Sequence, residues 1–571
     1  MVEQTAWFFC RVSSKTSNKI EIFKLHNTEA YLNVTGNELM SFYKIFWLCA
    51  GLLFSCMSLA ESAAPAQAPH KNVFNVKEYR VEGNTLLPAI RIEEALYPFT
   101  GADKTIDDVE AARSALGKAY HDAGYLTVLV GIPEQTVSAG IVRLKVLEGS
   151  VEKVRVVGAQ YHDRSRILGS VPSLARGSVP YFPEVQQQMA YANRAADIRV
   201  VPVLKAGQTP GMVEAELRVN DKLPLHASLE LNNYASANTT PLRLTAMVRY
   251  DNLWQREHSL SVQYQTSPGD LEQVKVLSAT YLMPLPESAN QLALYSVVSR
   301  SNVAVVGDLT LIGQGDIFGA RWVMPMPARE KFSHSVTLGV DYKDFRDDTL
   351  LAGSNTGRTP ISYMPFSVGY NASSSDAGGM TSANLTANFQ LRGVADQMTD
   401  CGGQYVSQFE CKRFKAKPDY FYLRGSIERT QGLSENLSLF AKVGVQIAGG
   451  PLISNEQFVG GGADSVRGYF EAEQAGDDGA HSTLELRGPQ WARGEISELR
   501  MVTFVDAAHL RVQDPLPSQT AQVNLFSGGL GLRMQGWTNF NLRMDVAWPY
   551  NETLYTHVGG PRLRMKMSMI F

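Results

Sequence analysis

The chain ends, at residues 562–571, in the sequence RLRMKMSMIF, and this stretch decides the fold. Apolar side chains alternate here with Arg, Lys and Ser, which is the period-two pattern of a β-strand with one apolar and one polar face. About 9–11 residues are enough for a tilted strand to cross a bilayer. The stretch therefore predicts a membrane-crossing strand, and the chain closes on the aromatic side chain of Phe571.

The same alternation begins at residue 224 and recurs towards the C-terminus. It is clearest in residues 225–231, 242–250, 260–264, 437–447 and 540–548. A soluble β-sandwich alternates in the same way, but its strands usually have about five or six residues. Several runs here reach about nine or ten residues, and their polar face suits a water-filled lumen. At roughly 20–24 residues for each strand with its connection, residues 224–571 predict a transmembrane antiparallel β-barrel of about 16 strands.

Composition excludes two classes of protein. The 571-residue chain is 44% hydrophobic and 19% charged, with a formal net charge of −3 and a mean hydropathy of −0.14. A near-neutral balance argues against a nucleic-acid-binding protein, which would concentrate basic residues. Beyond residue 60 no run of 18 apolar residues occurs, which excludes a helical membrane protein.

Sequence motifs give no sign of catalysis. No H-E-x-x-H, G-x-S-x-G, P-loop or C-x-x-C motif is present, and the ten His are scattered without a second ligand at metal spacing. Gly313-Gln314-Gly315 lacks the spacing of a nucleotide loop and is interpreted as a turn. We therefore predict no enzyme, no metal and no cofactor. An enzyme with a lone Ser or His in the lumen is the alternative that these patterns leave open.

Residues 40–60 have the pattern of a secretory signal peptide. A lysine precedes sixteen mostly apolar residues, and the stretch closes on Ser-Leu-Ala, with small residues at the cleavage site. Met40 is then the start of the chain, 1–39 is a non-native extension, and 61–73 is a short Ala- and Pro-rich linker. A lipoprotein box ending at Cys56 is an alternative that the bulky residue after the Leu fits poorly.

Two similar modules are predicted between the linker and the barrel, at residues 74–149 and 150–223. The first runs strand, helix, helix, strand, strand, and its second helix opens at Thr105. The pattern returns about 75 residues later, since RVEG ending at Gly83 is echoed by RVVG ending at Gly158. Two exported tandem α/β modules of this size resemble POTRA domains, and a pair of generic ferredoxin-like modules is the alternative.

Cys401 and Cys411 would be the two cysteines of the mature chain. Nine residues separate them in a polar stretch, in a compartment that oxidises thiols. A disulfide that pins an exposed loop is the preferred interpretation, and a pair of free thiols is the alternative.

One loop carries the most specific motif. Residues 458–469 read FVGGGADSVRGY. Together with an exported chain, two POTRA-like modules and a barrel, the tetrad Val466, Arg467, Gly468 and Tyr469 resembles the two-partner secretion transporters, the TpsB or haemolysin secretion/activation family. That family belongs to a superfamily that also contains the barrel-assembly insertase.

The resemblance implies a role for each of these residues. In the family this loop folds back into the lumen, and its Arg meets an Asp within an F-x-D-x-G pattern on the wall. Here Phe504 and Asp506 match that pattern, whereas Ala508 stands where the family has Gly. We therefore expect Arg467 to pair with Asp506. The alternative is an Arg467 that is solvated in a surface loop.

The resemblance also implies a function, a location and partners. The chain would be an outer-membrane transporter of a Gram-negative bacterium, with its POTRA domains in the periplasm. It would pass an unfolded exoprotein of the adhesin or haemolysin class to the cell surface without ATP. Outer-membrane lipid and the barrel-assembly machinery would be further partners, the latter reading Phe571 as an outer-membrane signal; no nucleic acid is expected.

Two details concern the path of the exoprotein. Its N-terminal segment would add to a sheet edge of a module, with strands 198–204 and 212–219 as the preferred candidates.

Because linker 61–73 is too short and Pro-rich for a plug helix, the Arg467 loop would be the main closure of the pore. An insertase of other barrels and a passive pore are the alternatives; two modules argue against the first, and the motif against the second.

Overall fold

The structure is a computed structural model that describes residues 20–21, 31–32, 73–137, 139–285, 288–301, 303–306, 309–312, 314–346, 360–537 and 539–571. The predicted extension, the signal peptide and all but the last residue of the linker lie outside the described residues, apart from two short paired strands, β1 (Ile20–Glu21) and β2 (Tyr31–Leu32). Among the described residues, no helix is both long enough and apolar enough to cross a membrane.

The first module contains five strands and two α-helices. They are β3 (Phe74–Val76), β4 (Glu78–Glu82), α2 (Ala89–Leu96), the 3-10 turn η1 (Tyr97–Phe99), β5 (Gly101–Lys104), α3 (Ile106–Asp122), β6 (Val128–Gly131) and β7 (Ile141–Glu148). A sheet of order β4-β7-β6 is accompanied by the pair β3-β5. Helix α3 begins after Thr105, whose N–H and hydroxyl both donate to the Asp108 carboxylate, at 2.7 and 2.8 Å.

The second module repeats this plan without the small strand pair. Its elements are β8 (Val151–Val157), α4 (Arg164–Gly169), η2 (Pro172–Leu174), α5 (Phe182–Ala192), β9 (Ile198–Ala206) and β10 (Val213–Asp221). The sheet order is β8-β10-β9, with β8 parallel and β9 antiparallel to β10. One face of this sheet and both helices enclose a core that includes Val185, Val200 and Leu217.

Two equivalent glycines explain the sequence repeat. Gly83 and Gly158 follow the first strand of the main sheet in each module and have φ of 86° and 94°. A Cβ at Gly83 would lie 2.5 Å from the carbonyl oxygen of Val146, and one at Gly158 would lie 2.3 Å from that of Val219. Both positions thus require a left-handed backbone that passes directly over the last strand, and only glycine meets both demands.

The sheet order corrects one of the two strands preferred for capturing the exoprotein. Strand β10, which contains most of the predicted 212–219 strand, is paired on both sides. It has no free edge to which a peptide could add. Strand β9 lies at the edge of the sheet, although Pro202 within it has no N–H to donate and so interrupts that edge.

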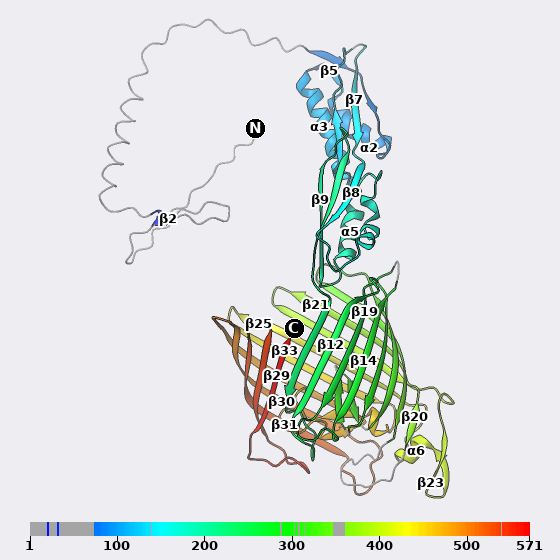
Figure 1. Ribbon diagram of the computed structural model, residues 1–571, viewed down its shortest axis with the longest axis vertical. Helices are drawn as coiled ribbons and strands as arrows, with labels where there is room; N and C mark the ends of the chain where they lie inside the picture. Colours follow the sequence, from blue (N-terminus) through cyan, green and yellow to red (C-terminus); the bar gives the residue numbers. More distant parts are fainter. Residues whose placement is uncertain are drawn as a thin grey trace, which may run out of the picture. The chain divides into compact units, whose positions relative to one another are not determined.

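The predicted antiparallel barrel is present and closed. Its strands are β11 (Leu225–Asn232), β12 (Arg243–Leu253), β13 (His258–Thr266), β14 (Lys275–Pro284), β15 (Gln291–Ser299), β18 (Gly315–Pro325), β19 (Phe332–Phe345), β20 (Ile361–Tyr363), β21 (Phe366–Asp376), β22 (Gly379–Phe389), β25 (Phe421–Ser434), β26 (Leu437–Ala448), β29 (Asp478–Arg493), β30 (Ile496–Arg511), β31 (Gln522–Gly536), β32 (Phe540–Pro549) and β33 (Arg562–Ile570). They follow one another around the wall in chain order (Figure 1).

Sixteen strands form the described wall, because β20 and β21 are two parts of one. Both pair with β19, and the break at Met364-Pro365 separates them. Strand β33 closes the circle on β11, with Ser228 opposite Ile570 and Asn232 opposite Lys566. The main-chain N–H of Phe571 donates to the carbonyl of Ala227 at 2.8 Å, so the last residue is held by the first strand.

The strand faces follow the alternation in the sequence. On β33 the side chains of Leu563 and Met569 are exposed on the outer face, whereas Arg564 is buried inside. Connections alternate between short turns, such as Glu435-Asn436, and longer loops. Because outer-membrane barrels have short periplasmic turns and long extracellular loops, the longer loops mark the extracellular end.

An extracellular loop carries the two cysteines. Between β22 and β25 it forms the hairpin of β23 (Met398–Cys401) and β24 (Gln404–Ser407), followed by helix α6 (Gln408–Lys412). Cys401 and Cys411 are joined by a disulfide. Another hairpin, β16 (Val303–Val306) with β17 (Leu309–Ile312), lies between β15 and β18.

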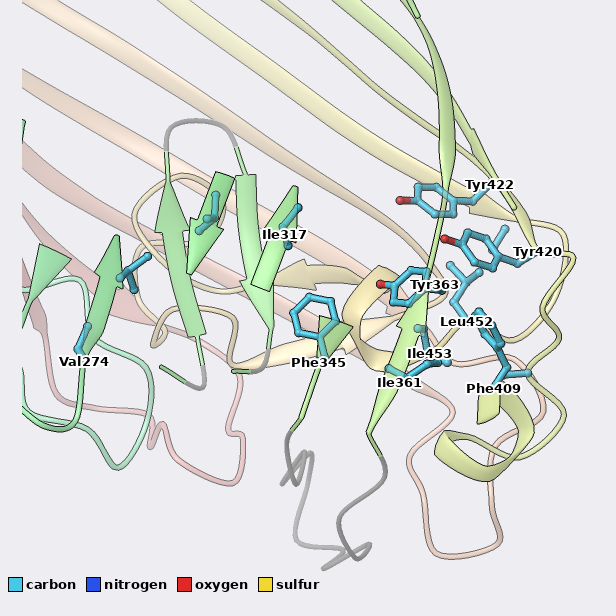
Figure 2. Close-up of a cluster of buried hydrophobic side chains, with 14 residues drawn as sticks. Val274, Ile317, Phe345, Ile361, Tyr363, Phe409, Tyr420, Tyr422, Leu452 and Ile453 are labelled. Carbon is cyan, nitrogen blue, oxygen red and sulfur yellow. The ribbon is translucent and has the colours of Figure 1, made fainter. Parts of the chain in front are cut away.

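Aromatic packing joins this loop to the barrel wall. The rings of Tyr363, Phe409 and Tyr420 lie with their centroids 5.7 to 6.5 Å apart (Figure 2). Leu452 and Ile453, which follow β26, belong to the same buried cluster. The extracellular end therefore has its own hydrophobic core, and the loop that follows β26 packs into it through Leu452 and Ile453.

Candidate functional site: a loop held in the barrel lumen

The segment 449–477 between β26 and β29, here called the lumen loop, carries the predicted motif. At its base lie the turn η3 (Ser454–Glu456) and the hairpin of β27 (Phe458–Gly460) with β28 (Gln474–Gly476). Gly461 and Gly462 then turn the chain with φ of 97° and 113°. The tip, residues 463–471, contains the motif and contacts side chains of the wall.

Arg467 is almost fully enclosed, with 2% of its side chain exposed. Its Nε and Nη2 donate to the two carboxylate oxygens of Asp506 on β30, at 2.8 and 2.9 Å. Its main-chain N–H donates to the same carboxylate at 3.2 Å. The guanidinium carbon lies 3.3 Å from the centroid of the Phe504 ring. The structure thus brings together the three residues that the motifs predicted to meet.

Two further carboxylates complete the site, and no sequence motif predicts either of them. Nη1 of Arg467 donates to Glu485 on β29 at 2.9 Å and lies 3.5 Å from an oxygen of Asp545 on β32. Arg533 on β31 bridges these acids, at 3.2 Å from Glu485 and 2.8 Å from Asp545. The lumen-facing alternation of β29 and β32 could have indicated them, but no motif singles them out.

The other motif residues fit the tip against the wall. The hydroxyl of Tyr469 donates to the carbonyls of Phe526 and Asn551 at 3.2 and 2.9 Å. Val466 is fully buried in a cluster with Tyr469 and Leu525. A Cβ on Gly468 would lie 2.9 Å from that of Ser527, so the tip approaches β31 too closely for a larger residue.

Ala508, the departure from the family pattern, is accommodated by the loop itself. It lies within β30 and is buried against Val466 and Tyr469. A Cβ added to Gly460 would lie 3.6 Å from the Ala508 methyl and 2.8 Å from a methyl of Leu510. The extra methyl on the wall thus faces a glycine on the loop, and β30 keeps its register through this position.

Strand β33 holds the tip from another side, through main-chain carbonyls. Arg564 donates from Nη2 to the carbonyl of Tyr469 and from Nε to that of Arg467. Arg562 donates from Nε to the carbonyl of Gly468 at 3.1 Å and lies over the Phe470 ring at 3.6 Å. Strand alternation predicts both arginines on the polar face of the last strand but does not indicate their role.

The base of the loop has its own buried attachment, at Glu456. Its carboxylate accepts bonds from Lys343 and Tyr363 at 2.6 and 2.5 Å, and from Tyr422 at 2.7 Å. These partners lie on β19, β20 and β25. The loop is therefore fixed to one group of strands at its base and to another, β29 to β33, at its tip.

A second attachment at the base joins the loop to the disulfide-bonded segment. Asp477 accepts two bonds from the guanidinium of Arg413, which follows α6, and further bonds from the main-chain N–H groups of Leu452 and Gln513, at 2.9 and 2.7 Å. The side chain of Asp477 is fully buried. Cys411 lies two residues before Arg413, so the disulfide restrains the segment that carries this arginine.

A polar cavity of about 710 Å³ lies beside the tip. Its lining includes Asp464 and Glu471 of the loop and Arg487, Arg500 and Arg543 of the wall. Several lining residues, such as those of β32 and β33, lie near the short-turn end. A charged space thus adjoins the loop inside the barrel.

Comparisons with known proteins agree with this architecture. The sequence model described as "POTRA domain, ShlB-type" matches residues 74–149. The one described as "Haemolysin secretion/activation protein ShlB/FhaC/HecB" matches residues 213–534, more than half of the chain.

Curated relatives and solved structures are consistent with this family match. The chain is 22% identical over 498 residues to the outer membrane transporter CdiB of Dickeya dadantii (strain 3937), covering 83% of each chain. It is 24% identical over 476 residues to CdiB of Escherichia coli O6:K15:H31 (strain 536 / UPEC), covering 81% of this chain and 76% of the other. Its fold is similar to that of CdiB from Escherichia coli, with a TM-score of 0.57 and 18% identity. The match covers 94% of this chain and 99% of the CdiB chain.

A solved structure of BamA has a similar fold as well. BamA from Haemophilus ducreyi lacking POTRA domains 1–3 is similar with a TM-score of 0.53 and 13% identity, over 87% of this chain and all of that one. At such identity the likeness concerns the fold alone. The family match over 213–534 and the CdiB relatives place the chain on the transporter side.

Fold and site together define an outer-membrane transporter of the POTRA-plus-barrel type. More narrowly, the chain belongs to the haemolysin secretion/activation family ShlB/FhaC/HecB and is a two-partner secretion transporter, with its POTRA domains in the periplasm. This family transports a secreted partner protein.

Proposed function

We propose that the lumen loop is the gate of the transporter and that Arg467 is its latch. The observation that carries this proposal is the enclosure of Arg467 by Asp506, Glu485 and Phe504. Charge-assisted bonds with bidentate geometry hold a loop in one place with directional specificity. Such a latch can also be released, because a polar polypeptide in the lumen competes for the same groups.

Transport then needs no nucleotide. An unfolded exoprotein enters from the periplasm, displaces the tip and threads the lumen, and its folding outside the cell prevents return. The chain acts on its partner by passage alone and catalyses no reaction. The family description, which names haemolysin secretion and activation, supports an exoprotein of the haemolysin class, and an adhesin is the alternative cargo.

The first contact is a strand added to a module sheet. Strand β9 supports this role because it lies at the edge of the second sheet and is nine residues long. Its N–H row is interrupted at Pro202, so a captured segment pairs with β9 on one side of that residue rather than along its whole length. The edge of β8 is the remaining main-sheet edge of this module.

Two further partners follow from the barrel. Lipid surrounds the apolar outer face formed by residues such as Leu530 and Leu563. The barrel-assembly machinery inserts the chain and recognises its last strand, which ends at Phe571. The signal peptide directs the chain to the periplasm and is cleaved after residue 60.

Mass spectrometry of culture medium and outer membranes, with and without this chain, tests the proposal. Loss of one large protein from the medium, with the membrane proteome intact, is expected and identifies the exoprotein. Broad loss of barrel proteins from the membrane would instead assign the chain to the insertases.

A further inference from the structure

The lumen face of β33 carries three cations with different partners. Lys566 pairs with Glu230 on the neighbouring strand β11, at 2.7 Å. Arg562 and Arg564 instead contact the tip of the lumen loop. The same short strand thus contains one cation bound to the wall and two bound to the lumen loop.

The acceptors on the loop are mostly main-chain carbonyls. Arg564 and Arg562 between them bind the carbonyls of Arg467, Gly468 and Tyr469. A main-chain carbonyl is present at every residue of any polypeptide. Recognition of this kind therefore depends on the conformation of the bound chain and hardly on its sequence.

The ion pair of Arg564 also belongs to the loop. Its Nη1 lies 3.2 Å from the carboxylate of Glu471, and only 2% of the Arg564 side chain is exposed. By contrast, Arg543 and Arg533 are paired with Asp545, which is part of the wall. Departure of the tip would take away this carboxylate together with the two carbonyls that Arg564 binds. A guanidinium that loses its partners in a confined site is costly, so the site favours a substitute.

The spacing of the two arginines suits an extended chain. They lie two residues apart on β33, and an antiparallel strand rises about 3.4 Å per residue. Carbonyls that point to the same side of an extended polypeptide recur at the same two-residue interval. A strand-like segment in the lumen could therefore offer one carbonyl to each arginine at once.

We propose that Arg562 and Arg564 form a binding site for the main-chain carbonyls of an extended polypeptide. The loop tip fills the site at rest, and the exoprotein in transit fills it after the tip has moved. The site would bind the exoprotein next to Arg467 independently of the exoprotein's sequence. This inference rests on the proposed release of the loop during transport.

A peptide-block experiment tests the site. Residues 461–473 are replaced by a Gly-Ser linker in the full chain, which removes the tip but keeps β27 and β28. Purified channels in planar bilayers are exposed, on the short-turn side, to an uncharged 20-residue peptide of Ser, Thr, Asn and Gly. The dwell time of each current block is measured in this parent, in Arg564→Gln and in the matched control Lys566→Gln, which removes one cation from the same strand.

Arg564→Gln is expected to shorten the dwell time by about tenfold, as the loss of charge-assisted bonds would. Lys566→Gln should leave it within about twofold. Equal dwell times in all three channels, or equal shortening in both variants, would overturn the carbonyl site.

A second parent channel, which keeps the lumen loop, controls for the possibility that the linker variant misfolds. Arg562→Gln and Arg564→Gln are compared in channels that keep the loop but carry Arg467→Gln. If neither parent channel is ever blocked by the peptide, the proposed passage through the lumen fails. If the parents are blocked and neither Arg562→Gln nor Arg564→Gln shortens the block relative to its parent, only the carbonyl site fails.

Discussion

Arg467 and Asp506 meet through three hydrogen bonds, two from the guanidinium and one from the main-chain N–H of Arg467. The side chain of Asp506 has no exposed surface. Because the main chain takes part, the pair fixes the path of the loop as well as the direction of one side chain. Arg467→Lys would keep the charge and the main-chain N–H but lose the two parallel bonds of the guanidinium, so it would not reproduce the pair.

Arg467→Ala should increase single-channel conductance and current noise. The change removes the bonds to Asp506 and Glu485 and leaves the buried carboxylate of Asp506 without its partner, a loss of about 3–5 kcal/mol for a buried pair. Glu485 keeps its pairs with Arg487 and Arg533. Planar-bilayer recording of the purified full chain measures the effect. Asp506→Ala should act in the same direction.

The control is Arg429→Ala, because Arg429 bonds to Asp376 rather than to the lumen loop. Its currents should match those of the unmodified chain. Unchanged currents in both latch variants would refute the latch.

Gly468→Ala should loosen the tip without changing any charge. The new methyl would come within 2.9 Å of the Cβ of Ser527 and 3.1 Å of the main-chain nitrogen of Pro549. Overpacking of this kind costs about 1–3 kcal/mol. Hydrogen exchange of residues 463–471 should become faster than in Gly450→Ala, where the added methyl meets nothing within 4 Å; equal rates would show that the tip tolerates the methyl.

Glu456→Gln should free the base of the loop. The amide keeps the size of the side chain but removes the negative charge that Lys343 requires, and leaves that buried amine unpaired. Exchange should accelerate in residues 452–458 while the Arg467 contacts persist. Faster exchange at the tip alone would contradict this separation of base and tip.

Asp221 makes the second module sensitive to acid. Burial raises the pKa of its carboxyl, but bonds from the main-chain N–H groups of Gln160, Tyr161 and His162 lower it, and the net pKa lies below the ordinary value. The carboxylate therefore stabilises the module above the unfolded pKa of about 3.9, and this stabilisation is lost as pH falls through the lower folded pKa.

Asp221→Asn tests this pH dependence. At pH 7 the variant should unfold at a lower temperature, with a loss of about 1–3 kcal/mol. Below the folded pKa the unmodified chain and the variant should converge. Calorimetry of the full chain at several pH values gives both numbers, and a constant difference down to pH 2 would exclude the carboxylate as the cause.

Much of this fold could be predicted because strand alternation is a strong local signal. Leu563 and Arg564 point to opposite faces simply because they are neighbours in a strand, and the same rule holds around the wall. The pairing of Arg467 with Asp506 was predicted from motif resemblance. It could not have followed from alternation, which says which face a residue occupies but not which loop reaches it.

What the sequence could not provide were contacts that depend on three-dimensional closure. Glu485 and Asp545 are ordinary lumen-facing acids until the tip arrives between their strands. The central position of β10 depends on pairing between distant strands, and so the choice of that strand as a capture edge was wrong. Glu456 lies in a loop without periodicity, and nothing in its neighbours signals a buried carboxylate.

The separate attachments of the loop have a mechanical consequence. If the tip leaves the wall while Glu456 and Asp477 keep their contacts at the base, the displaced segment stays close to its resting position beside Asp506. Rebinding is then an intramolecular event, governed by a high effective concentration rather than by diffusion from solution. The pore would reseal by itself when the last residue of the cargo has passed, and the outer membrane would be leaky only for the duration of each passage.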